Sequence, residues 1–189
     1  ITTRRRFPQV SNNLQVRWCS SILKIDVGNI ALCNQPRFNN KKLLFVTGER
    51  AEEGGRRKFY PVFAKHKCDL RDSRKARLID VYRPVHTYKT AEVWQTIERY
   101  GINCHPCYKL GWGRCSCAGC IFSGADEMAT LQVICPEKFA RLSNLEREFG
   151  FPIRRGIYLD DFAKSGSIFQ NLNEHDVALI NSKQYTDRI

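Results

Sequence analysis

The stretch Leu43-Leu44-Phe45-Val46-Thr47-Gly48-Glu49-Arg50 decides the fold class that the sequence predicts. Its first four residues form a continuous apolar run, which is typical of a strand that is buried on both faces. The four residues after that run form a polar loop at the carboxyl end of the strand. In an open α/β sheet, ligands bind at this end of the strands. We therefore predict a buried strand over 43–46 that leads into a ligand-binding loop.

Strand and helix patterns follow one another along the rest of the chain. Alternation over 77–82 predicts a second strand. A good N-cap and apolar residues on one face predict a helix over 90–100. Pro136 begins a further helix, in which apolar residues recur every three to four positions until Gly150 ends it. We therefore expect an α/β protein with a helical C-terminal part over about 136–189.

The composition indicates a folded and basic protein. The 189 residues include 31 Lys or Arg and 19 Asp or Glu, so the formal net charge is +12, and 42% are hydrophobic. This hydrophobic content excludes the disordered class, and the length fits a single domain over 1–189. The excess positive charge favours an anionic partner, whether a nucleotide, sulfate or nucleic acid.

The apolar runs exclude a membrane-spanning segment. They are four or five residues long, whereas a helix that spans the bilayer needs roughly 20 apolar residues. No signal peptide opens the chain. We therefore expect a cytoplasmic protein that has no membrane partner, and the sequence gives no indication of its oligomeric state.

Five of the nine cysteines lie in a Cys-rich loop over 104–120. Cys104 with Cys107, and Cys117 with Cys120, form two C-x-x-C pairs, a spacing that brings two thiolates to one metal ion. Two such pairs can complete a tetrahedral zinc site. Ligation by thiolates alone suits zinc and an iron–sulfur cluster equally well. The loop is therefore the strongest candidate for a metal centre.

Two other interpretations of the cysteines remain open. Isolated cysteines such as Cys33, Cys68 and Cys135 fit better as reduced thiols that pack like small apolar side chains. A thioredoxin-like redox pair at Cys117 and Cys120 ranks below metal binding, because such a pair normally opens a helix after a strand. Here the pair follows a Gly-rich loop.

Five segments between residues 17 and 155 share their order and spacing with a known family. They are Arg17-Trp18-Cys19-Ser20-Ser21-Ile22-Leu23-Lys24, residues 47–53 with Arg56-Arg57, Tyr82-Arg83-Pro84-Val85, Glu92-Val93-Trp94 and residues 105–122. Together they resemble the phosphoadenosine-phosphosulfate (PAPS) reductase-like branch of the adenine-nucleotide alpha-hydrolase, or ATP-pyrophosphatase, superfamily, near the sulfurtransferases of DNA phosphorothioation.

This resemblance implies a doubly wound, mostly parallel α/β sheet that binds an adenine nucleotide at the carboxyl ends of its strands. The family's nucleotide-binding loop, Ser-Gly-Gly-x-Asp-Ser, does not occur in the 189 residues. In the family this loop lies upstream of the Arg-Trp-Cys segment. The chain is therefore expected to be the C-terminal portion of a PAPS reductase-like domain.

The resemblance also implies an activity. Family members reduce adenylated sulfate or use ATP to activate a substrate for sulfur transfer. We therefore expect an ATP-pyrophosphatase-type enzyme of sulfur metabolism that binds ATP or adenylated sulfate, with DNA or RNA as a candidate substrate and a sulfur-donating protein as a candidate partner.

Two alternatives to this activity remain. One is a zinc-stapled module that binds nucleic acid or protein without catalysis. The other is a true sulfonucleotide reductase, against which the lack of the family's C-terminal Glu-Cys-Gly-like tail counts.

The metal ligands are assigned through the same resemblance. Cys19 is similar to the first member of the family's tandem Cys-Cys, whose second position holds Ser20, and Cys117 and Cys120 are similar to its later C-x-x-C pair. The fourth ligand is assigned to Cys107, with Cys115 or Cys104 as alternates. The expected cofactor is an iron–sulfur cluster, and Zn²⁺ is the alternative.

Gly48, Arg50 and Arg57 resemble the family's nucleotide- or sulfate-binding residues, because guanidinium groups bind such anions through paired hydrogen bonds. A solvated basic face is an equal alternative for the two arginines. Asp80 and the Glu52-Glu53 pair are candidate Mg²⁺ ligands, although a solvated loop explains them as well. No catalytic base is assigned, and His86 and His105 are left out of the catalytic residues.

Overall fold

The structure is a computed structural model that describes residues 4–182 of the chain. Contacts within the chain divide it into two compact units. We call Ile22–Ile102 the central unit, and we call the described parts of Ile1–Ser21 and Asn103–Ile189 the terminal unit. That the two units form a single domain over 1–189 stays a prediction.

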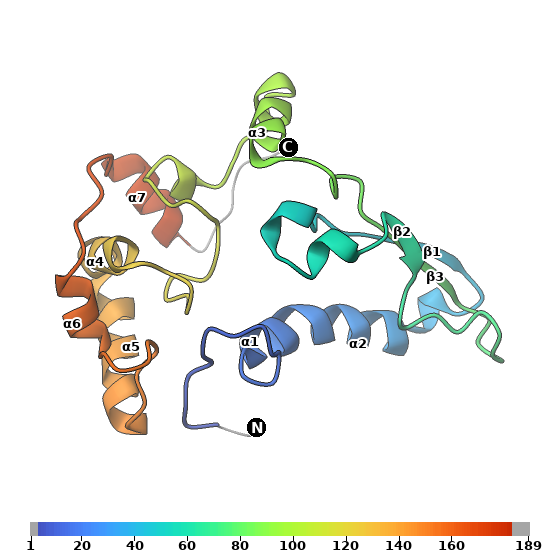
Figure 1. Cartoon of the computed structure of the whole chain (residues 1–189), viewed down its shortest axis with the longest axis horizontal. Helices are drawn as coiled ribbons and strands as arrows, with labels where there is room; N and C mark the ends of the chain where they lie inside the picture. The colour runs from blue at the N-terminus through green and yellow to red at the C-terminus, as the bar shows by residue number, and fades with distance from the viewer. Residues whose placement is uncertain (1–3, 183–189) are drawn as a thin grey trace. The chain divides into compact units, whose positions relative to one another are not determined.

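The central unit holds a three-stranded sheet in the order β1-β3-β2 (Figure 1). Strands β1 (Lys42–Val46) and β3 (Leu78–Tyr82) run parallel, and β2 (Phe63–Lys65) pairs with β3 in the antiparallel direction. The doubly wound, mostly parallel α/β sheet that the sequence predicted is therefore wrong. Within residues 4–182 the fold is mainly helical, with three strands in one small mixed sheet.

The reason for this error is that β1 is not buried on both faces. Leu44 and Val46 keep 55% and 58% of their surface exposed. Phe45 points the other way and lies close to Gly28 of helix α2 (Asp26–Asn34). The apolar run over 43–46 thus belongs to a sheet in which a helix packs on the Phe45 side and the opposite side keeps large apolar residues exposed.

Short helices complete the central unit. Besides α2 it contains α3 (Thr90–Arg99), and the sequence prediction of a helix over 90–100 is confirmed. The remaining helical segments are the π-helix η1 (Ser21–Ile25), which begins at the boundary of the unit, and the 3₁₀ helices η2 (Pro36–Phe38), η3 (Ala51–Glu53) and η4 (Arg57–Phe59).

Two buried charged side chains organise β3. Arg77 is 1% exposed and donates hydrogen bonds to the carbonyl oxygens of Leu32 and Cys33. These carbonyls lie in the last turn of α2, where the helix dipole favours a cation. The buried Asp69 carboxylate accepts from the Ile79 backbone N–H at 2.7 Å and from Arg71 Nε at 2.9 Å. The Arg71 guanidinium holds the pKa of Asp69 well below its usual range.

The terminal unit is helical. Its longer helices are α4 (Ala125–Ile134), α5 (Pro136–Phe149), α6 (Leu159–Lys164) and α7 (Glu174–Asn181), and the short α1 (Trp18–Ser20) precedes them. Helix α5 confirms the prediction from Pro136 to Gly150, which ends the helix with φ of 66°. Helix α6 contacts α4 and α5. No helix within residues 4–182 has the length and apolar character that a membrane span requires.

The core between these helices is closely packed. Its buried apolar side chains are Ile121, Met128, Leu131, Phe139, Ile153, Leu159 and Ala163. A Cβ atom at Gly166, just after α6, would lie 2.2 Å from the backbone carbon of Ala125 at the start of α4. A residue without a side chain is therefore required at this position.

One buried carboxylate fixes the loop between α5 and α6. Glu146 is fully buried, and its two oxygens accept the backbone N–H groups of Ile153 at 2.5 Å and Leu159 at 2.7 Å. Burial raises the pKa of Glu146, while these two hydrogen bonds act in the opposite direction. The loop over 150–158 is thus held close to both of its ends by a single side chain.

We expect Glu146→Gln to lower the free energy of unfolding by about 1–3 kcal/mol, because the new amide group turns one acceptor into a donor and leaves a buried N–H unpaired. Urea unfolding followed by circular dichroism measures the change. The matched control is Glu148→Gln, whose side chain is 57% exposed and whose ion pair to Arg5 is 3.5 Å long. We expect the control to change stability by less than about 0.5 kcal/mol. An equal loss in both variants would contradict this role of Glu146.

Candidate metal centre

The chain turns tightly around Cys107. The 3₁₀ helix η5 (Pro106–Tyr108) begins with a proline, and the side chain of the preceding His105 caps it. The His105 Nδ1 atom accepts the backbone N–H of Cys107 at 3.2 Å. The Cys107 carbonyl in turn accepts the backbone N–H of Trp112 at 2.9 Å. These hydrogen bonds fix residues 105–112 with Cys107 at their centre.

Apolar packing anchors this turn in a second core of the terminal unit. Leu110 is completely buried and Trp112 is 9% exposed. The Trp112 ring meets the edge of the Phe169 ring at a centroid distance of 5.0 Å and an interplanar angle of 88°. Gly111, which lies between Leu110 and Trp112 in the chain, has φ of 112°. A Cβ atom at this position would lie 3.1 Å from the Phe169 ring. Glycine is therefore required at position 111 both by the backbone and by its neighbour.

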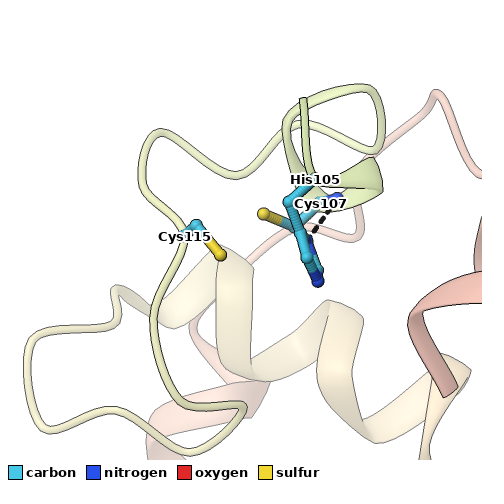
Figure 2. A group of neighbouring side chains, drawn as sticks. All are labelled: His105, Cys107 and Cys115. Carbon is cyan, nitrogen blue, oxygen red and sulfur yellow. Dashed lines mark hydrogen bonds between the residues drawn. The ribbon is translucent and has the colours of Figure 1, made fainter. Parts of the chain in front are cut away.

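Three potential metal ligands meet at this turn (Figure 2). A ring nitrogen of His105 and the Sγ atoms of Cys107 and Cys115 all lie within 4.8 Å of one another. We call these three residues the His105 trio. Cys115 comes from the later part of the loop, and its backbone N–H donates to the Tyr108 hydroxyl at 3.1 Å. Within residues 4–182, this is the one group of three such donors that comes together.

The trio holds a protonated thiol in the absence of a metal. Burial raises the pKa of Cys107 to about 12, and the neighbouring Cys115 and Cys104 thiols act in the same direction. A bound divalent cation favours the thiolate instead of the thiol, because a thiol that coordinates a metal loses its proton. A metal ion at the trio would therefore bind with release of a proton from Cys107.

His105 can join a metal centre only by giving up its cap. Its Nδ1 atom accepts a hydrogen bond, so this atom carries no proton in the neutral ring. A metal at Nδ1 would displace the Cys107 N–H, and a metal at Nε2 would move the ring proton to Nδ1. The Cys107 thiol also has hydrogen-bond partners, the Cys115 thiol and the Tyr108 backbone. A metal ion would replace the hydrogen bond between the two thiols with bonds to both sulfur atoms.

A closed zinc site needs four ligands, whereas a catalytic site keeps three and leaves one position open. Cys117 lines the same cavity of about 230 Å³ as His105 and Cys107, and Cys104 lies near enough to influence the Cys107 thiol. Either residue is a candidate fourth ligand. The donor set of the loop therefore fits a zinc ion.

The ligands expected from the sequence do not all gather here. Cys107 lies in the trio. Cys115, which was predicted as an alternate for Cys107, lies in the trio together with it. Cys117 and Cys120 form a turn, closed by a hydrogen bond of 3.1 Å from the Cys120 N–H to the Cys117 carbonyl. Cys19 packs against the core of α4 to α6. The set Cys19, Cys107, Cys117 and Cys120, with Cys104 or Cys115 as alternates, stays a prediction.

Sequence reasoning missed His105 as a potential ligand. The signal was present in Cys104-His105-Pro106-Cys107, where a third donor type stands inside a C-x-x-C pair. Zinc sites commonly mix cysteine and histidine ligands. From the sequence, His105 was considered only as an acid–base group.

The residues expected to bind a nucleotide lie in the central unit, after β1. The loops that follow β1 and β3 are adjacent, because the Thr47 N–H donates to the Tyr82 carbonyl at 3.0 Å. Arg83 Nε also pairs with Glu49 at 2.5 Å. Gly48 is exposed within this pair of loops. The loops that follow the two parallel strands β1 and β3 are therefore adjacent.

Both predicted anion-binding arginines already have carboxylate partners. Arg50 pairs with Glu52 at 2.9 Å and Glu53 at 3.5 Å, and its side chain is 16% exposed. Arg57 pairs with Glu53. Glu52 in turn accepts from the Thr90 backbone and hydroxyl, and these hydrogen bonds lower the pKa of Glu52. A bound anion would have to compete with these carboxylates.

The candidate Mg²⁺ ligands are likewise paired. Asp80 accepts from Arg71 at 2.7 Å, and Glu52 and Glu53 carry the arginine partners described above. A cation would therefore have to displace guanidinium groups from these carboxylates.

Comparison with known proteins adds one relative. An uncharacterized 37.8 kDa protein from the gpa 5′ region of Escherichia phage 186 is 28% identical over 151 residues. The match covers 80% of this chain and 42% of the phage protein, so the chain spans about two fifths of the length of this relative. No family model and no solved structure matches the chain. The name of the phage protein states no activity.

We expect zinc affinity to fall by at least about tenfold for each pH unit between pH 8 and pH 6, because Cys107 must lose a proton to bind. Competition with a chromophoric chelator measures the affinity. Cys107→Ser should abolish the pH-dependent binding, whereas Cys33→Ser, in the central unit, should keep it. An affinity that does not change with pH would contradict ligation by Cys107.

Proposed function

We propose that this chain is part of a PAPS reductase-like enzyme of sulfur metabolism, of the ATP-pyrophosphatase type, which binds an adenine nucleotide and activates a substrate for sulfur transfer. The observation that carries this proposal is the approach of Cys107 and Cys115 within the His105 trio. The trio lies in residues 105–122, one of the segments that resemble the family. The metal-thiolate centre would organise the site or handle sulfur.

The donor set bears on which metal is bound. A histidine among thiols suits Zn²⁺, whereas four thiolates suit an iron–sulfur cluster. Cys117 lines the same cavity as His105 and Cys107, so it offers a thiol in addition to those of Cys107 and Cys115. A cytoplasmic location fits either metal, because reducing conditions keep thiols available as ligands.

The nucleotide is proposed to bind at the adjacent loops after β1 and β3. Phosphate or sulfate oxygens can replace the Glu52 and Glu53 carboxylates on Arg50 and Arg57, since guanidinium groups bind both kinds of anion in the same geometry. The displaced carboxylates would then be free to hold the Mg²⁺ that accompanies ATP. This exchange of partners reconciles the predicted residues with their ion pairs.

A second candidate function is a zinc-stapled module that binds nucleic acid or protein without catalysis. The carboxylate partners of Arg50 and Arg57 favour it, because these two arginines are satisfied without a nucleotide. The metal would then serve only to fix the Cys-rich loop. Metal analysis and nucleotide binding separate the two candidates.

We expect metal content to depend on the trio. Protein purified without oxygen is analysed for zinc, iron and acid-labile sulfide, as the wild type, as a Cys107→Ser, Cys115→Ser double variant and as a Cys117→Ser, Cys120→Ser double variant. The first double variant should lose the metal, and Cys33→Ser should keep it. Iron with sulfide supports the enzyme, and zinc without sulfide supports the zinc-stapled module. Full retention of metal by the first double variant would exclude the trio.

Nucleotide binding tests the central unit. We expect Mg-ATP to bind the wild-type chain in isothermal titration, and Arg50→Gln to weaken binding by roughly 10- to 100-fold through loss of a charge-assisted hydrogen bond. The matched control is Arg56→Gln, an exposed neighbour, which should change affinity less than about twofold. Thermal unfolding checks that both variants are folded. Failure of the wild type to bind ATP would favour the second candidate function.

A further inference from the structure

The terminal unit contains a cavity of about 1,070 Å³ between the N-terminal segment and the loop that joins α5 to α6. Six residues between positions 6 and 16 line one side of it, and residues 150–158 line the other. We call it the arginine cavity. None of the cysteines lines it, so this cavity is separate from the candidate metal centre.

Its walls are fixed by specific contacts. The Gln9 side chain donates to the Pro152 carbonyl at 2.9 Å, which ties the two sides together. The Phe7 and Phe149 rings pack with their centroids 5.6 Å apart. On the inner side, Glu146 holds the loop through its N–H partners Ile153 and Leu159. The cavity therefore belongs to the folded terminal unit and does not depend on a ligand to form its walls.

The charges that line the cavity are all positive. They come from Arg6, Arg154 and Arg155, and no acidic residue is among the lining residues. Within residues 4–182, none of these three arginines forms an ion pair with a carboxylate. The nearby acids are engaged elsewhere, Glu148 with Arg5 and Asp160 with Arg147. Three arginines without a carboxylate partner line one space, and this excess of positive charge favours an anionic ligand.

The cavity also presents aromatic surface. Phe151 is 62% exposed and Tyr158 is 40% exposed, and both line the cavity. The Arg154 guanidinium lies over the Phe162 ring at 4.6 Å, a contact that orients its planar group. Exposed aromatic rings beside arginines are the combination on which nucleic-acid bases stack while their phosphates bind.

We propose that the arginine cavity binds single-stranded nucleic acid. A base stacks on Phe151 or Tyr158, and neighbouring phosphates bind Arg6, Arg154 and Arg155. A free nucleotide has the same chemistry of base and phosphate. The arginines lie on both sides of the cavity, Arg6 on one and Arg154 with Arg155 on the other, which favours a strand with several phosphates. This site depends neither on the metal centre nor on sulfur chemistry.

Fluorescence anisotropy with a labelled single-stranded dT12 oligonucleotide tests the proposal on the full chain at several salt concentrations. Arg6→Gln, Arg155→Gln removes two of the charges, and Phe151→Ala removes a stacking surface. We expect each of these variants to weaken binding by about tenfold or more. The double variant should also reduce the salt dependence, with the slope of log K against log salt smaller by about 1.4, or about 0.7 per lost phosphate contact.

Matched controls distinguish the loss of specific cavity contacts from a general loss of positive charge or of exposed aromatic surface. Arg74→Gln, Arg141→Gln removes two exposed arginines outside the cavity, and Phe59→Ala removes a ring that is 77% exposed in the central unit. Both controls should bind the oligonucleotide within about twofold of the wild type. Equal losses in the cavity and control variants would overturn the proposal, as would no binding by the wild type. Thermal unfolding and metal content confirm that each variant is folded.

Competition with dTMP distinguishes a nucleic-acid strand from a free nucleotide as the ligand of the arginine cavity. If a strand is the occupant, dTMP should compete at least about 100-fold less well than unlabelled dT12, because a strand places several phosphates on the arginines at once. Competition by dTMP as strong as that by dT12 would overturn the strand and assign the cavity to a free nucleotide. Loss of the metal in Cys107→Ser, Cys115→Ser with oligonucleotide binding retained would show that the two sites are independent.

Discussion

Burial of Leu110 and Trp112 is the interaction on which the Cys-rich loop depends. The loop over 104–120 contains a single short helix, η5, so its conformation is not set by regular hydrogen bonding. Burying side chains of this size contributes about 1.5–3 kcal/mol each. The turn at Gly111 lets both side chains enter the core against Phe169. Because Cys107 lies at the start of this turn, the same burial that anchors the loop also excludes water from its thiol.

The sequence predicted local structure better than it predicted architecture. Helices α3 and α5 were found because apolar periodicity and end residues act within a few turns. The strands β1 and β3 were predicted too, but the prediction that they belong to a doubly wound, mostly parallel sheet was wrong. A run of apolar residues such as 43–46 indicates a strand without showing whether a second layer covers its other face. The 55% and 58% exposed fractions of Leu44 and Val46 depend on tertiary structure, which the local pattern does not contain.

The candidate sites show a similar limit. Cysteine spacing identified the loop and included Cys107 and Cys115, because pairs close in sequence tend to be close in space. It missed His105 as a ligand, because the approach of Cys115 to this histidine depends on the contact with the Tyr108 hydroxyl, which brings the later part of the loop back. The sequence likewise does not show which arginines form ion pairs with carboxylates in the fold. Arg50, which the sequence favoured, is held by two carboxylates, whereas Arg6 and Arg155 have none within the described residues.

The Glu146 carboxylate has a consequence for the motions of the terminal unit. Its two oxygens hold N–H groups 7 and 13 residues further along the chain, and all three groups are buried. Releasing either N–H leaves a buried charge with one fewer donor, so opening one end of the loop favours opening the other. The Ile153 and Leu159 amides are therefore expected to open as one cooperative unit with α5. The loop that carries Arg154 and Arg155 is tied to this helix through a single side chain.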